Sequence, residues 1–155
     1  MALALTEGPA PGGQPIVGGD IYEAVRLEEG VPVHGRDIDL RNLPQDAGLD
    51  DALSFSKGCY TGQEPIARLH YRGQPARALR GLVLAEDAGV PIPGASLLAN
   101  GGEVGRVTSA GRSPGLGRPI ALAYIRRKAW KLEEVTLETT GDIAAVRALP
   151  LYPAS

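Results

Sequence analysis

The sequence predicts an α+β protein, in which a small α/β segment is followed by a C-terminal antiparallel β-barrel. After Pro75 the chain consists of short β-rich segments separated by glycine, proline and asparagine, whereas helical patterns are confined to the residues before it. Six short strands do not provide enough surface for two thick layers with helices. A closed or nearly closed barrel is therefore expected for residues 75–155.

A boundary between two units is expected at Arg72-Gly73-Gln74-Pro75, where the helical pattern gives way to the β-rich one. The chain has 155 residues, which is enough for one ordinary domain or two small ones. We therefore divide it into residues 1–74 and residues 75–155.

The first unit is expected to begin with irregular chain and one helix. Proline and glycine dominate residues 1–19, which suits a loop with a short edge strand at residues 14–17. A helix follows, with Asp20 as its N-cap and Gly30 at its end. Prolines and glycines then interrupt residues 31–56, for which we expect coil with one short strand.

A second helix is expected over residues 62–71. Thr61 and Glu64 have the spacing of a capping box, in which each side chain bonds the other's backbone N–H. Gly62 would take the first helical position. Pro65 falls within the first turn, where its missing N–H costs little.

The six expected strands follow one another with turn residues between them. They are residues 78–85, 96–99, 102–109, 120–125, 134–138 and 143–148. Asn100-Gly101 and Gly141-Asp142 are strong hairpin signals, because both pairs tolerate the positive φ angles that tight turns require.

Composition and charge exclude several classes of protein. A hydrophobic share of 43% with 22% charged residues is typical of a globular protein. A net charge of -2 gives no basic field for a phosphate backbone, so direct binding of duplex nucleic acid is not expected. Apolar stretches fall far short of the roughly 20 residues that cross a bilayer, and the N-terminus lacks signal-peptide features. We therefore expect a cytoplasmic protein without a membrane span.

The chain has a single cysteine, Cys59. It therefore forms no internal disulfide and does not alone build a four-cysteine metal or cluster cage. Cys59 lies just before the second expected helix, where unpaired amide donors and the helix dipole favour a thiolate, and Lys57 and Arg68 add positive charge. The alternatives are a small buried hydrophobe for Cys59 and a solvated surface charge for Lys57.

The string Lys57-Gly-Cys-Tyr-Thr-Gly-Gln-Glu64, continuing into Ile66-Ala-Arg68, resembles the signature of the YgfZ family of folate-binding iron-sulfur cluster assembly and repair proteins. Aminomethyltransferase, the T-protein of glycine cleavage, has a related motif. Its usual form carries Gly-x-Glu-Ala where this chain has Gly62-Gln63-Glu64-Pro65. That difference favours the YgfZ family.

The resemblance extends along most of the chain. Residues 22–32 and 35–39 resemble a segment shared by both families, and residues 105–109 and 120–124 resemble the C-terminal barrel of both. Both families imply a three-lobed ring around a folate cavity. The N-terminal half, with the aspartate used in aminomethyl transfer, has no counterpart here. The chain thus resembles a C-terminal half, with residues 1–74 as the C-terminal part of a T-protein-like folate-binding domain.

The resemblance implies tetrahydrofolate as the cofactor and a set of site residues. Those expected in catalysis are Cys59 and Lys57, and those expected to bind the cofactor are Glu28, Arg68, Tyr60 and Gln63. Glu28 falls where the families place a carboxylate facing the pterin, whose paired N–H donors suit a bidentate acceptor. Arg68 would reach the anionic glutamate tail of folate. The alternatives are a surface acid for Glu28, a helix-face residue for Arg68 and a helix-start residue for Gln63.

The function implied by the resemblance is that of a non-catalytic accessory factor in iron-sulfur cluster assembly or repair, supporting iron-sulfur enzymes that include tRNA-modifying ones. Cys59 would engage a cluster, a sulfur species or a client thiol. The expected partners are folate, iron-sulfur client proteins, and a missing N-terminal lobe or second copy. No acid–base pair accompanies Cys59, and His34 and His70 show no ligand spacing.

Two alternative functions stay open. One is a folate-dependent aminomethyltransferase of the T-protein class, for which Asp37 or Asp39 would have to supply the carboxylate that assists transfer. The other is an inactive truncated homologue, because half of a fold need not bind anything.

Overall fold

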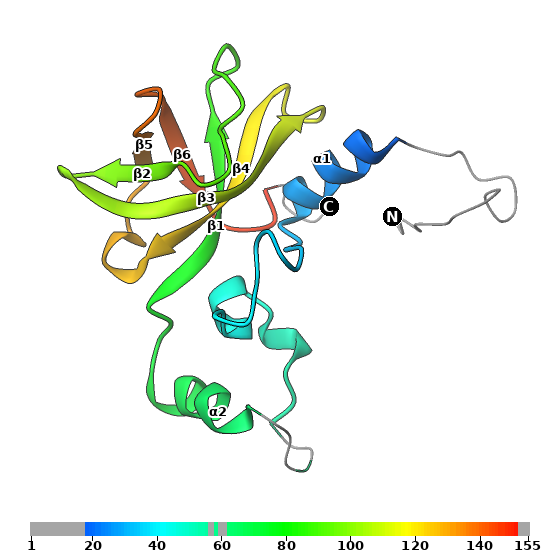
Figure 1. The fold of residues 1–155 in the computed structure, drawn as a ribbon, viewed down its shortest axis with the longest axis vertical. Helices are drawn as coiled ribbons and strands as arrows, with labels where there is room; N and C mark the ends of the chain where they lie inside the picture. The colour runs from blue at the N-terminus through cyan, green and yellow to red at the C-terminus, as the bar shows by residue number, and fades with distance from the viewer. Residues whose placement is uncertain (1–17, 56–57, 59–61, 152–155) are drawn as a thin grey trace, which may run out of the picture.

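The computed structural model describes residues 18–55, 58 and 62–151, without the side chains of His70 and Arg72. Its helices and strands follow one another along the chain as shown in Figure 1. They are α1 (Gly19–Glu29), η2 (Pro44–Ala47), η3 (Asp50–Ala52), α2 (Gln63–Arg72), β1 (Arg77–Leu84), β2 (Ser96–Ala99), β3 (Gly102–Ser113), β4 (Arg118–Arg126), η4 (Arg127–Ala129), β5 (Glu134–Leu137) and β6 (Ile143–Arg147).

The strands form a closed barrel in the order β1-β4-β3-β2-β5-β6, and every neighbouring pair is antiparallel. Closure gives each strand two partners, so no edge is left to pair with another molecule. The α+β class and the antiparallel barrel predicted from the sequence are thereby confirmed. Register shifts in β2 and β3 mark β-bulges, which help the sheet to curve.

The tight turn between β2 and β3 lies where the sequence predicts it. Asn100 and Gly101 have φ angles of 51° and 74°, as a hairpin with two left-handed residues requires. Gly141, in the connection from β5 to β6, has a φ of 76°. The strand limits agree closely except in β3, which continues to Ser113 instead of ending at Ser109. Both serines are buried, and polar residues resemble a strand end when only the sequence is read.

Two groups of apolar side chains make the core. The first fills the barrel, and its largest buried members are Leu82, Leu84, Leu97, Val107, Ile125 and Leu137. The second lies on the barrel's outer side, where Leu27 of α1 packs with Leu79, Ile120, Leu122 and Tyr124. Residues 119–125 of β4 are consequently buried on both faces, so this strand lacks the usual alternation of apolar and polar residues.

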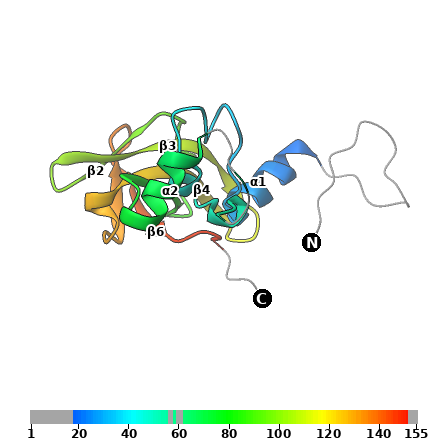
Figure 2. The ribbon, with the colours of Figure 1, turned by 90° about the horizontal axis from the view of Figure 1, so that it is seen from below.

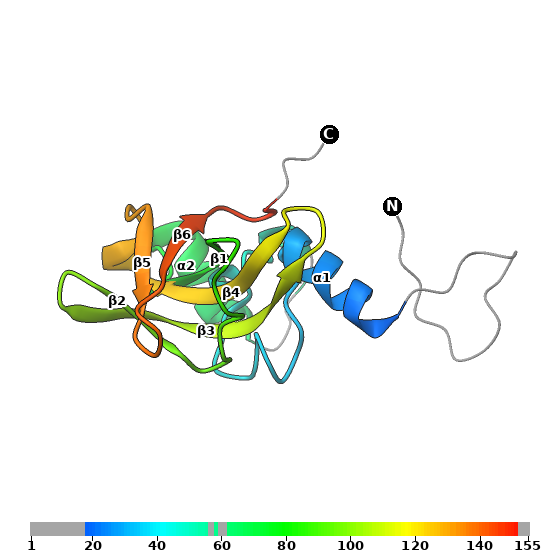
Figure 3. The same cartoon turned by 90° about the horizontal axis from the view of Figure 1, so that it is seen from above.

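Helix α1 lies against the outside of β3 and β4, as Figure 3 shows from above. Its end at Gly30 is confirmed: this residue has a φ of 72°, and its N–H bonds the Arg26 and Leu27 carbonyls. Its predicted N-cap was wrong, because Gly18 takes that position and Asp20 lies in the first turn. Gly111 allows the close approach, since a Cβ there would come within 2.9 Å of Leu27.

The segment after α1 differs from the predicted coil with one strand. His34 and Ile38 form an isolated bridge, and the chain then makes the two short 3-10 helices η2 and η3. Pro44 supplies a fixed φ at the start of η2, and Gly48 ends it with a φ of 71°. Turns of this length have no helical periodicity, so the sequence pattern does not reveal them.

Helix α2 lies below the barrel, beyond η2 and η3 (Figures 1 and 2). Its existence is confirmed, but Gly62 is its N-cap, with a φ of 84°, rather than its first residue. Thr61, the other half of the predicted capping box, lies outside the described residues, as does the predicted strand at residues 14–17. Gln45 of η2 links the two parts, since its Nε2 donates to the Ile66 carbonyl at 2.9 Å.

Candidate functional site

A buried ion pair joins α1 to the loop that follows it. Arg26 Nη1 donates to Asp37 Oδ2 at 2.9 Å, and the two side chains are 1% and 0% exposed. The same nitrogen donates to the Val31 carbonyl at 2.8 Å. A buried charge pair is stable only when its remaining hydrogen-bonding positions are also filled. The surroundings of Asp37 meet that condition.

Asp37 accepts four hydrogen bonds. Besides Arg26, Oδ2 accepts from the Val33 N–H at 3.0 Å. Oδ1 accepts from the hydroxyls of Thr108 and Ser109 of β3, each at 2.6 Å. This carboxylate therefore fastens helix, loop and barrel together. Its oxygens are occupied, so Asp37 has a structural role rather than that of an assisting carboxylate for transfer.

Glu23 extends this network to the surface. Its Oε2 accepts from Arg26 Nη2 at 2.9 Å and from Arg36 Nη2 at 2.6 Å. Burial acts to raise the pKa of Glu23, but the hydrogen bonds and charges of Arg26 and Arg36 hold it below its ordinary value. Glu23 is thus a carboxylate that balances two arginines.

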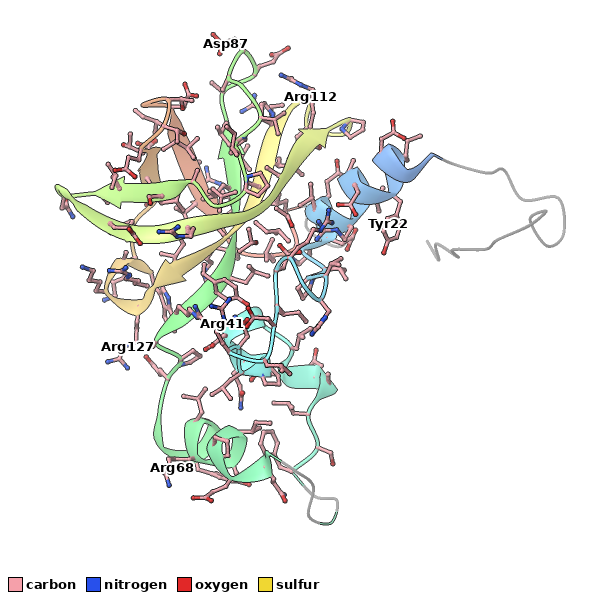
Figure 4. The ribbon with its side chains drawn as sticks, viewed as in Figure 1. Tyr22, Arg41, Arg68, Asp87, Arg112 and Arg127 are labelled. Atoms are coloured by element: carbon pink, nitrogen blue, oxygen red, sulfur yellow. The ribbon has the colours of Figure 1, made fainter. Side chains whose placement is uncertain are left out.

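A polar cavity of about 530 Å³ lies beside this network, and we call it the arginine cavity. It is lined by Arg36, Asp37, Asp39, Arg41, Asn42, Arg77, Glu103, Gly105, Arg106, Thr108, Tyr124 and Arg126. The walls come from the loop after α1 and from β1, β3 and β4. In Figure 4, Arg41 marks its position between the barrel and the segment below it. Five guanidinium groups face three carboxylates there.

Tyr124 has an unusual environment in the arginine cavity. Within the described part of the chain, its buried hydroxyl has no hydrogen-bond partner. The Arg77 guanidinium lies over the ring, 4.9 Å from its centroid. Burial raises the pKa of Tyr124 to about 12, so the phenol keeps its proton at physiological pH.

Asp39, the other carboxylate considered for transfer, is engaged by its neighbour. Arg41 donates to both oxygens, and these hydrogen bonds lower the pKa of Asp39 to about 2. The exposed pair lies at the rim of the arginine cavity, where solvent screens it. Asp39 is therefore a permanently charged partner of Arg41 near neutral pH.

A second cavity, of about 490 Å³, lies along α2 and is lined by Leu43, Glu64, Pro65, Arg68, Leu69 and Gly73. Arg68, expected to reach the folate tail, is on this wall and forms an exposed ion pair with Glu64 at 3.0 Å. Figure 4 shows Arg68 far from the barrel. Gln63 is the first residue of the same helix.

Glu28 lies at the end of α1, apart from both cavities just described. The hydroxyl of the fully buried Ser113, at the end of β3, donates to Glu28 Oε1. The structure therefore does not place Glu28 with Arg68 and Gln63 around one cavity. Cys59, Lys57 and Tyr60 lie outside the described residues, and their roles stay predictions.

Sequence reasoning missed Arg26 and Tyr124, and it considered Asp37 as a carboxylate for transfer rather than as the centre of a buried network. Thr108 and Ser109 are 71 and 72 residues away from Asp37 along the chain, so no local spacing signals their contact. Among the residues that the structure describes, no three His, Cys, Asp or Glu side chains are grouped to hold a metal ion. The same residues include no helix long and apolar enough to cross a membrane.

The barrel is similar to a domain of a known protein family. Residues 77–152 match the family model described as the glycine cleavage T-protein C-terminal barrel domain. The barrel is T-protein-like. Helix α1 packs against this T-protein-like barrel, and two residues of its strand β3 donate hydrogen bonds to Asp37.

The similarity to aminomethyltransferases extends beyond the barrel. The aminomethyltransferase of Streptomyces avermitilis is 39% identical over 125 residues, which covers 79% of this chain and 33% of that protein. The aminomethyltransferase of Streptomyces coelicolor is 38% identical over 137 residues, with 84% and 37% covered. The crystal structure of glycine cleavage system aminomethyltransferase T from Bartonella henselae aligns with a TM-score of 0.73 at 32% identity, covering 84% of this chain and 37% of that one.

The chain thus spans about a third of the length of these relatives and resembles their C-terminal part. These matches support the aminomethyltransferase class, given by the sequence as the alternative, better than the YgfZ family. The specific YgfZ assignment, iron-sulfur clients and tRNA modification remain predictions.

Replacing Asp37 with asparagine should lower the free energy of unfolding by about 3 kcal/mol, because the buried Arg26 would lose its buried counter-charge and keep only the partly exposed Glu23. Urea denaturation followed by circular dichroism measures the change. Asp39→Asn is the matched control, since its exposed pair contributes little. If the two variants lost similar amounts of unfolding free energy, the central role of Asp37 would be contradicted.

Tyr124 should make the chain sensitive to strong alkali. Its folded-state pKa of about 12 exceeds the ordinary value of 10.0, so its contribution to stability is complete below pH 10 and is lost between pH 10 and 12. Denaturant unfolding between pH 9 and about 11 should therefore show a steeper loss of stability in the wild type than in Tyr124→Phe. Equal slopes would show that this phenol titrates normally.

Proposed function

We propose that this chain supplies the folate-facing C-terminal part of a folate-dependent aminomethyltransferase, with Glu28 as its contact to the pterin. The observation that carries the proposal is the similarity of residues 77–152 to the T-protein C-terminal barrel domain. Relatives named aminomethyltransferase that align over 79% and 84% of this chain support the same class.

The surroundings of Glu28 fit the role of a pterin acceptor. The Ser113 hydroxyl bonds one carboxylate oxygen, and the Leu116 N–H donates to that hydroxyl at 2.9 Å. On the backbone side, the Leu151 N–H donates to the Glu28 carbonyl at 2.7 Å. Among the described residues, Ser113 is the only donor to this carboxylate. Glu28 is therefore held in place with acceptor positions left for the paired N–H groups of a pterin.

Tetrahydrofolate, when bound, would supply the nitrogen that receives the one-carbon unit. This chain's part would be to bind and orient the pterin through Glu28. The helix that carries Glu28 is fixed by the ion pair of Arg26, two residues earlier, with Asp37. Precise placement of a reacting group accounts for a large share of the rate in such reactions. Arg68 and Gln63 remain candidates for contacts at α2.

Because the chain spans about a third of its relatives, the rest of the folate cavity would come from another lobe, in the same or in a separate polypeptide. The carboxylate that assists transfer would also come from there, since Asp37 and Asp39 are engaged by other residues. Folate should consequently bind weakly to this chain alone, as a ligand that touches only part of its pocket.

A second proposal rests on the octapeptide from Lys57 to Glu64 and on Pro65 directly after it, where the usual T-protein motif Gly-x-Glu-Ala carries alanine. In this proposal the chain is a folate-binding accessory factor for iron-sulfur enzymes, and Cys59 engages a cluster, sulfur species or client thiol. A thiolate before a helix N-terminus has the required nucleophilicity.

For the first proposal, we expect Glu28→Gln to weaken tetrahydrofolate binding roughly 10- to 100-fold, because charge-assisted hydrogen bonds to the pterin are lost. Calorimetric titration would use this chain mixed with the N-terminal two thirds of an aminomethyltransferase. Glu29→Gln, at the exposed neighbour, is the control. Equal affinities of the two variants, or no heat with the wild type, would contradict the proposal.

For the second proposal, Cys59→Ser should abolish the ability of the gene to restore iron-sulfur enzyme activity in a strain that lacks its own YgfZ. The circular dichroism spectrum should be unchanged. Cys59→Ala removes the same sulfur atom without introducing a hydroxyl group. Full restoration by either variant would remove the cysteine from the function.

A further inference from the structure

We propose that the arginine cavity binds a small polyvalent anion through carboxylate or phosphate groups, at a place separate from the pterin contact of Glu28. This site goes beyond the proposed function and does not depend on it. The cavity volume of about 530 Å³ falls within the range of small-molecule pockets, roughly 300–1,000 Å³.

The charges that line the cavity favour an anion. Of its three carboxylates, Asp37 is neutralised by Arg26, which lies outside the lining. Asp39 is engaged by Arg41. Glu103 alone serves both Arg126, at 3.0 Å, and Arg106, at 3.7 Å. Outside the lining, Glu23 pairs with Arg36, and Asp46 lies near Arg77. With Arg26 included, six guanidinium groups therefore share five acids within the described part of the chain.

Within the described part of the chain, the polar contacts of two of the arginines are all long. Arg77 lies 3.7 Å from Asp46 and donates to the Arg41 carbonyl at 3.4 Å. Arg106 lies 3.7 Å from Glu103 and donates to the Gly94 carbonyl at 3.4 Å. A guanidinium group carries five N–H donors in a planar fork that matches carboxylate and phosphate oxygens. These two side chains thus retain donors for a ligand.

Tyr124 is an independent indication of a ligand. Its side chain is more than nine-tenths buried, and its hydroxyl has no partner among the described residues. Buried polar groups without a hydrogen bond are rare and costly in folded proteins. The residue lies on the cavity wall beneath the weakly held Arg77. An anion that draws the Arg77 side chain toward itself would expose the Tyr124 hydroxyl. The anion would then accept a hydrogen bond from that hydroxyl.

The number of donors indicates the class of ligand. Arg77, Arg106 and Tyr124 come from three different strands, so a ligand that reaches them all needs several anionic oxygens. Pyrophosphate and a tricarboxylate such as citrate have this character. Because the attraction is largely between charges at a partly open site, binding should weaken as salt concentration rises.

The test is calorimetric titration of the full chain with sodium pyrophosphate and, separately, with citrate at low salt. We expect saturable binding of at least one, weakened about tenfold in Arg106→Gln and unchanged in Arg118→Gln, an exposed arginine outside the cavity. Tyr124→Phe should weaken binding severalfold while raising the melting temperature of the free chain, since it removes an unpaired hydroxyl. A purely structural role for this tyrosine would not produce that combination.

The two probes also separate the possible ligand classes. Binding of pyrophosphate alone supports a phosphate ligand, and binding of citrate alone supports a carboxylate ligand. Absence of binding to both by the folded wild type would overturn the proposal, as would equal affinities of Arg106→Gln and Arg118→Gln. Glu28→Gln should keep its anion affinity, and a loss there would refute the separateness of the two sites.

Discussion

The buried carboxylate of Asp37 is the interaction on which the arrangement of this chain depends. Its oxygens accept hydrogen bonds from Arg26 of α1, from the loop after that helix, and from two hydroxyls of β3. A charge inside a protein is tolerated only when it is paired and fully hydrogen-bonded. The helix, the loop and the barrel must therefore come together at the same time to satisfy it.

This constraint positions both candidate sites. Glu28 follows Arg26 closely on α1, so fastening the helix brings its carboxylate to the buried hydroxyl of Ser113. On the other side of the network, the loop that contains Asp37 also carries Arg36 and Arg41 to the rim of the arginine cavity. The apolar contact of Leu27 with the outer face of β4 supports the same placement.

The two sites have opposite chemical character. Glu28 offers a fixed acceptor, which suits the N–H groups of a pterin, whereas the arginine cavity offers donors to an anion. A T-protein-like barrel provides the rigid support for both. The matched part of this chain covers only 33% and 37% of two of its relatives. The proposed transfer activity therefore depends on contacts that this chain would share with another lobe.

The strands, the hairpin at Asn100-Gly101 and the helix end at Gly30 follow from the sequence alone, because neighbouring residues decide local conformation and strand alternation. Only the tertiary structure reveals the partners of Asp37 and Glu28, since residues more than 70 positions apart meet in each case. The same holds for Tyr124, which on sequence is an ordinary strand tyrosine. Within the described part of the chain its buried hydroxyl has no partner, and it lies on a strand that is buried on both faces.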